Sequence, residues 1–118
     1  MRSVAFAILA LGALACSPDP TGADANTNEI SVSDDFFTPD VDTVSSNETV
    51  TFTFSPTNAH THNVTWDSGP TVPAGSGDKI GGQSYTAMLG TAGTYLYHCT
   101  YHGTGSGGGM AATLVVKP

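Results

Sequence analysis

Short segments in which apolar and polar residues alternate make up most of this chain, and glycine, proline, asparagine or aspartate separates each from the next. A period of two places successive side chains on opposite faces of a strand, and no window shows the period of an amphipathic helix. The alternating segments are residues 29–33, 49–54, 63–66, 85–89, 94–99 and 111–116. Repeated short strands with turns between them predict an all-β sandwich or small barrel.

The first fifteen residues indicate an export signal rather than a part of the core. Arg2 precedes an apolar run, residues 4–14, that is too short to span a bilayer. The end of this segment, ALAC at 13–16, resembles a bacterial lipobox, although Ala13 stands where Leu is usual. The resemblance implies a signal peptide over residues 1–15 and lipidation at Cys16. An ordinary secretory signal that ends beside a cysteine is the alternative.

The next segment predicts a flexible tether over residues 16–28. It holds Pro, Gly, Asp, Asn and Thr without any apolar periodicity. Residues 29–118 then form the one domain that a chain of 118 residues allows. We therefore expect an exported protein of the periplasm or cell envelope that contacts a membrane only through lipid on Cys16.

The charge of the chain restricts its partners. The chain has ten acidic and three basic residues, which give a formal charge of -7. Without the signal only Lys79 and Lys117 remain against the ten acids, so the charge of the mature chain is -8. Nucleic acid is excluded as a partner, because phosphate binding needs a basic surface. We expect a monomer whose partner has a basic docking patch, although general solubility explains the charge nearly as well.

A group of metal-binding side chains lies near the C-terminus. Cys99 ends an alternating segment, His102 follows within a turn, and the glycine-rich residues 103–109 let the chain return to Met110. A thiolate, an imidazole and a thioether from one strand-loop-strand unit favour copper. A fourth ligand should come from elsewhere in the chain. His62 is the candidate, and His60 is its local competitor.

Each candidate ligand also has a structural interpretation. Cys99 could be a core thiol, or it could pair with Cys16 in an oxidising compartment. His102 could be a surface residue of a turn, and Met110 could be ordinary core packing. Zinc is a conceivable metal because Cys and His suit it, but Met does not.

Taken together, these motifs resemble the cupredoxins, especially the plastocyanin and amicyanin branch. The motifs are His62-Asn63-Val64, then Ala92-Gly93-Thr94-Tyr95 leading into Tyr97-His98-Cys99-Thr100-Tyr101-His102, and then Gly109-Met110. The resemblance covers residues 29–116 and implies an all-β Greek-key sandwich or barrel of the cupredoxin type, with about seven to eight strands. It also implies a mononuclear type 1 (blue) copper centre, with His62, Cys99 and His102 in a trigonal plane and Met110 as the long axial ligand.

The resemblance further implies a function in electron transport. A single copper ion would pass one electron between exported redox proteins, without catalytic turnover of its own. In the family, the imidazole that corresponds to His102 reaches the surface as the electron port, and residues 103–109 would form much of its rim. An extracytoplasmic copper carrier or storage protein is the alternative. It would need exposed Met-rich or His-rich ligands, and only Met88 and Met110 remain after the signal.

Two more roles follow from the family pattern. The Asn after the first His ligand braces the loop that carries the cysteine, which implies that Asn63 binds Thr100. A solvent-facing Asn63 is the alternative. His98 stands where plastocyanins have an aromatic residue that marks a remote docking patch. We therefore expect His98 to be exposed near a docking surface, or to be a plain surface histidine.

Overall fold

The computed structural model describes residues 27–118, which form eight strands and no helix. The strands are β1 (Glu29–Ser33), β2 (Phe36–Thr38), β3 (Val41–Ser45), β4 (Thr49–Phe54), β5 (Thr65–Ser68), β6 (Ser84–Met88), β7 (Gly93–Gly103) and β8 (Gly109–Lys117). None of the described residues belong to a helix that is long and apolar enough to cross a membrane. The predicted signal peptide, Cys16 and all but the last two residues of the predicted tether lie outside the described residues.

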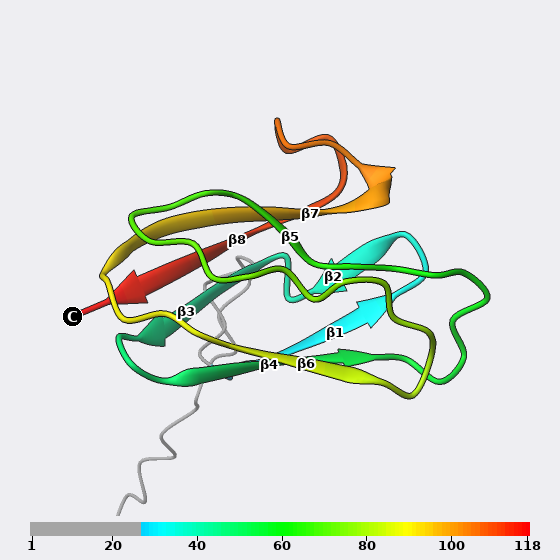
Figure 1. Ribbon diagram of the computed structural model, residues 1–118, viewed down its shortest axis with the longest axis horizontal. Coiled ribbons are helices and arrows are strands. Elements are labelled where there is room, and N and C mark those ends of the chain that lie inside the picture. The colour runs from blue at the N-terminus through cyan, green and yellow to red at the C-terminus, as the bar shows by residue number, and fades with distance from the viewer. Residues whose placement is uncertain (1–26) are drawn as a thin grey trace, which may run out of the picture.

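Two four-stranded sheets make up the domain (Figure 1). One has the strand order β2-β1-β4-β6 and the other β3-β8-β7-β5. Two neighbouring pairs are parallel, β1 with β4 and β3 with β8, and the remaining pairs are antiparallel. Parallel neighbours cannot be joined by a tight hairpin, so the chain passes repeatedly from one sheet to the other. The predicted all-β sandwich is confirmed.

The alternation of β7 builds the core beneath the candidate site. Tyr95, Tyr97 and Cys99 are fully buried, whereas the residues between them are only partly buried. Phe52 of the opposite sheet packs edge-on against Tyr97, with the ring centroids 5.3 Å apart. Burial of a large apolar side chain contributes about 1.5–3 kcal/mol. These contacts therefore hold the strand that carries Cys99 firmly against the other sheet.

Three details depart from the sequence prediction. Strands β2 and β3 are additional to the predicted strands. The sequence of β3 does not alternate between apolar and polar residues, because two successive polar residues, Asp42 and Thr43, are buried in it. The strand predicted at 63–66 begins only at Thr65. Val64 is buried, but its backbone N–H donates to the Ser76 hydroxyl at 2.8 Å instead of to a neighbouring strand.

The last hairpin is longer and tighter than predicted. Strand β7 continues to Gly103, which pairs with Gly109 at the start of β8, so residues 104–108 protrude as a loop (Figure 1). A Cβ atom on Gly103 would overlap the carbonyl oxygen of Met110, and Gly109 has a φ of +66°. Glycine is therefore needed at both positions, and the close pairing brings Met110 alongside the end of β7.

Candidate metal centre

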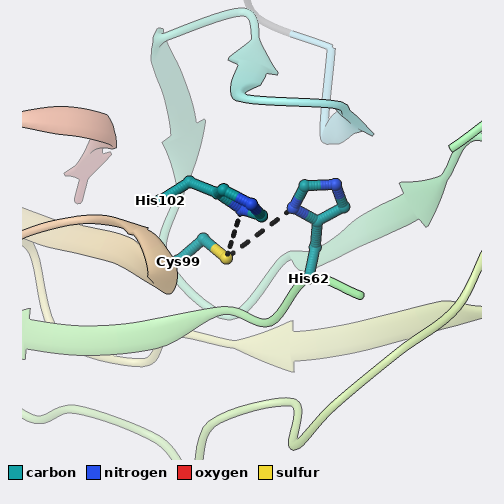
Figure 2. A group of neighbouring side chains, drawn as sticks. All are labelled: His62, Cys99 and His102. Atoms are coloured by element: carbon teal, nitrogen blue, oxygen red, sulfur yellow. Dashed lines mark hydrogen bonds between the residues drawn. The ribbon is translucent and has the colours of Figure 1, made fainter. Parts of the chain in front are cut away.

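Three side chains that can bind a metal face one another, as Figure 2 shows. The Nδ1 atom of His62 lies 3.7 Å from the Cys99 sulfur, and the Nδ1 atom of His102 lies 3.8 Å from it. One donor atom from each residue lies within 4.8 Å of the other two. A metal ion in a trigonal site binds nitrogen at about 2.0 Å and sulfur at about 2.3 Å, with an angle of about 120° between the two bonds. The nitrogen and sulfur atoms then lie about 3.7 Å apart. The observed separations therefore fit a trigonal site.

Strand β7 supplies two of these side chains. Cys99 follows Tyr95 and Tyr97 on the inner face. Regular alternation would turn His102, three residues further on, to the opposite face. The register between β7 and β8 shifts between His98 and Gly103, however, and the His102 ring faces the sulfur. The His102 side chain remains 25% exposed, so this ligand connects the site to the surface.

The third side chain, His62, comes from the segment before β5 and is fully buried. Its backbone N–H donates to Lys79 at 3.0 Å, and its carbonyl accepts from the Lys79 N–H at 2.8 Å. His60 is 60% exposed in its side chain and belongs to a different group, with Asp35 and His102. Of the two candidate histidines, His62 is the one whose ring faces Cys99.

The turn between β1 and β2 places a carboxylate against the outer side of the His62 ring. Asp34 Oδ1 lies 2.9 Å from His62 Nε2, and the same carboxylate accepts the backbone N–H groups of Ala59 at 2.8 Å and His60 at 3.3 Å. The bond from Ala59 and then the bond from His62 lower the pKa of Asp34 from 3.8 to about 2. Since Nδ1 faces the sulfur, Nε2 is the nitrogen that can donate a proton to Asp34.

A network of polar side chains ties the His62 segment to β7. Asn63 is buried, and its amide donates to the Thr100 hydroxyl at 2.8 Å and to Asp78 at 3.1 Å. The Thr100 backbone N–H returns a bond to Asn63 Oδ1 at 3.0 Å. The Tyr101 hydroxyl also donates to Asp78, at 2.6 Å. These bonds to Tyr101 and Asn63 lower the pKa of Asp78, which favours its charged form. The expected contact between Asn63 and Thr100 is present.

Met110 is the second residue of β8 and is almost fully buried. Its backbone lies against Gly103, directly after His102. The same side chain belongs to the hydrophobic core, so packing and metal ligation both fit its position. A thiolate and two imidazoles suit copper or zinc, and methionine is a ligand that suits copper and not zinc. The residues present therefore fit a copper ion.

His98 differs from the prediction. Its side chain is only 12% exposed, and its Nδ1 atom lies 2.8 Å from a carboxylate oxygen of Asp67 on β5. The prediction of an exposed His98 is wrong, because β5 lies beside β7 and brings a charged partner that covers the ring. The predicted docking surface near His98 stays a prediction.

Two residues of the site were not predicted from the sequence, Asp34 and Asp78. Asp34 lies 28 positions before His62, and Asp78 lies 15 positions after Asn63. Each contact joins two loops, and neither separation follows a strand or helix period. The adjacent aspartates at 34 and 35 are typical of a turn and indicate no contact with a ligand.

The fold and the donor set define a class, that of β-sandwich proteins with a Cys and two His side chains grouped for one metal ion. Plastocyanin from Prochlorothrix hollandica is 32% identical over 124 residues, which cover 97% of this chain and 89% of that protein. The chain therefore belongs to the cupredoxin family of electron-transfer proteins, in its plastocyanin-like branch. No family-level sequence profile matches the chain.

Solved structures agree with this assignment. A reduced amicyanin variant is 26% identical with a TM-score of 0.62, over 79% of this chain and 82% of its own. A fern plastocyanin variant is 29% identical with a TM-score of 0.59, over 75% of this chain and 99% of its own. A copper-containing nitrite reductase from Thermus scotoductus is 20% identical with a TM-score of 0.63, and this chain covers 25% of it. At that identity the nitrite reductase shares the fold alone.

Proposed function

We propose that this protein is an electron-transfer protein with a single type 1 copper ion, held by His62, Cys99 and His102 with Met110 as axial ligand. One observation carries the proposal. Two imidazole Nδ1 atoms lie 3.7 and 3.8 Å from one thiol sulfur, as a trigonal site requires. Bound copper would supply a one-electron couple between Cu(I) and Cu(II).

The surrounding chain is built to hold these ligands in place. His62 and Cys99 are both fully buried, so water is kept from that side of the site. The Lys79 bridge fixes the backbone of His62, and the bonds from Asn63 fix His62 relative to Cys99. Ligands that do not rearrange keep the cost of a one-electron step low, which suits a carrier of electrons.

His102 is the electron port in this proposal. It is the ligand whose side chain reaches the surface, at 25% exposed, while the other two are fully buried. Next to it, residues 104–109 are exposed and contain no charged side chain. On the side formed by residues 104–109, another protein can therefore approach the port without leaving a buried charge unpaired.

The burial of the ligands argues against the alternative of a copper carrier or storage protein. Such a protein needs ligands that an incoming ion can reach and exchange, and Cys99 and His62 are fully buried. Met88 is exposed on β6, which belongs to the sheet opposite the one that carries Cys99 and His102. The proposal includes no catalysis, because His62, Cys99, His102 and Met110 would together supply all four ligands of the copper ion.

The proposal includes an extracytoplasmic location and a redox partner. Export follows from the signal at residues 1–15, and attachment to a membrane follows from lipid on Cys16. The mature protein, residues 16–118, would act as a monomer. Its charge of -8, left by ten acids against Lys79 and Lys117, suits a redox protein with a basic docking patch.

Electron self-exchange between oxidised and reduced molecules tests this function, because a storage protein has no need for rapid exchange. NMR line broadening in mixtures of the two forms gives the rate. Ser106→Glu adds a charge to the rim, and we expect it to slow exchange at least about threefold at low salt, with recovery in high salt. Thr91→Glu adds the same charge beyond the other end of β7, about 30 Å away, and should change the rate little. Equal slowing by both variants, or no measurable exchange, would contradict the proposal.

A further inference from the structure

Two neighbouring aspartates in the turn between β1 and β2 face the two imidazole rings of the candidate centre. Asp34 Oδ1 lies 2.9 Å from His62 Nε2, and Asp35 Oδ1 lies 3.7 Å from His102 Nε2. Both rings turn Nδ1 towards the Cys99 sulfur (Figure 2). The outer nitrogen of each ring therefore points to one carboxylate of this turn.

The two contacts differ in strength. The Asp34 carboxylate is held by three donors of one loop, the backbone N–H groups of Ala59 and His60 and the ring of His62. Its side chain is 32% exposed, whereas that of Asp35 is 66% exposed. At 3.7 Å the contact between Asp35 and His102 is too long for a hydrogen bond. Only Asp34 is a fixed charge bonded to a ligand ring.

A fixed carboxylate behind a metal-binding imidazole has two physical effects. It accepts the outer N–H, which selects the tautomer that leaves Nδ1 free to bind and holds the plane of the ring. It also places a negative charge one ring away from the metal, which favours the more positive oxidation state. Both effects act on His62 from outside the set of ligands.

We propose that Asp34 is a positioning residue that holds His62 in its Nε2-protonated tautomer and lowers the reduction potential of the centre. The proposal rests on the proposed function, since the potential is that of the bound copper. It assigns a role to the β1–β2 turn that the motifs around Cys99 and His62 do not contain.

The potential of the copper-loaded mature protein is the first test. Asp34→Asn keeps the size of the side chain and an acceptor for Ala59 but removes the charge. We expect the ratio of reduced to oxidised protein at a fixed applied potential to rise about tenfold, which is about 59 mV for a one-electron couple. Asp35→Asn removes the same charge from the same turn and is the matched control. It should change the ratio less than about threefold, because Asp35 is more exposed and more distant from its ring. Equal shifts in the two variants, or no shift in Asp34→Asn, would overturn the proposal.

Nitrogen-15 NMR of the metal-free mature protein gives an independent readout. We expect His62 to show the Nε2–H tautomer, with a ring proton that exchanges slowly with water. In Asp34→Ala this proton should exchange at least about tenfold faster, and in Asp35→Asn it should not. Circular dichroism of each variant establishes that it is folded, and Asp34→Asn replaces Asp34→Ala if the latter is not. A wild-type His62 in the Nδ1–H tautomer, or exchange that is unaffected in both Asp34 variants, would refute the positioning role.

The two tests separate this inference from the function on which it rests. A protein that forms no thiolate-bound copper centre would refute the proposed function and the effect on the potential together. The NMR comparison would still decide whether Asp34 positions His62. A blue protein whose potential is insensitive to Asp34 would leave the function intact and overturn the inference alone.

Discussion

Asn63 and Thr100 exchange two hydrogen bonds, one from the Asn63 amide to the Thr100 hydroxyl at 2.8 Å and one from the Thr100 backbone N–H to Asn63 Oδ1 at 3.0 Å. Asn63 directly follows His62, and Thr100 directly follows Cys99. The pair therefore joins the two segments that hold the buried ligands. Because both residues stand one position from a ligand, any loosening of this contact would displace both donors.

Asn63→Ala should destabilise the protein and weaken metal binding. It removes the bonds of the Asn63 side chain to Thr100 and Asp78, and each hydrogen bond of this kind contributes about 0.5–1.5 kcal/mol of unfolding free energy. Thr100→Ala removes only the bond to the hydroxyl and should cost about 1 kcal/mol. Urea unfolding of the metal-free variants measures both. The account is wrong on this point if Thr100→Ala costs as much as Asn63→Ala.

Removal of the hydroxyl group should change the unfolding free energy differently at two buried tyrosines. The Tyr95 hydroxyl donates to the Thr91 carbonyl at 2.8 Å, so Tyr95→Phe should cost about 1 kcal/mol. The Tyr97 hydroxyl is buried without a partner among the described residues, and burial, followed by the nearby charges of Asp42 and Asp40, raises its pKa. Tyr97→Phe should therefore leave the unfolding free energy unchanged or raise it. A loss in Tyr97→Phe equal to that in Tyr95→Phe would show that the hydroxyl has a partner.

The acid stability of the metal-free protein should depend on Asp34. Its pKa in the folded chain is about 2, below the ordinary 3.8, so it contributes stability above about pH 4 that is lost as the pH falls towards 2. The sign follows because the unfolded chain takes up this proton at a higher pH than the folded chain does. Urea unfolding at several values between pH 2 and pH 5 should give a shallower pH dependence for Asp34→Asn than for the wild type. Identical slopes would contradict the assigned contacts.

Met110→Gln should alter the copper centre if Met110 is the axial ligand. An amide oxygen in place of the thioether changes the axial field, which tunes the spectrum and potential of a blue site. We expect a changed copper hyperfine splitting and a shift of the visible absorption band. Met88→Gln is the control, because Met88 is exposed on β6. A Met110→Gln spectrum identical to that of the wild type would assign Met110 to core packing alone.

The local part of the site could be predicted from the sequence. Cys99 and His102 lie three residues apart at the end of an alternating strand, so their closeness depends on one turn of backbone. The buried face of Tyr95, Tyr97 and Cys99 also follows from alternation alone. The shift in register between β7 and β8, which turns His102 inward, has no signal in the residues themselves.

The parts that depend on contacts between distant loops could not be predicted. Asp34 reaches His62 because the β1–β2 turn folds over the segment before β5, and Asp67 covers His98 because β5 lies beside β7. Both contacts depend on the order of strands in the sheets, which periodicity does not reveal. Strand β3 was missed for a different reason, since the burial of Asp42 breaks the apolar pattern that marks a strand.

The most direct test of the central claim is the absorption and EPR spectrum of the mature protein with one equivalent of Cu(II). Cys16→Ser in every sample leaves Cys99 as the sole thiol. A trigonal site with a short copper-thiolate bond predicts an intense visible band and a narrow copper hyperfine splitting, both lost in Cys99→Ser. A colourless wild-type protein, or a spectrum that Cys99→Ser leaves unchanged, would contradict the account.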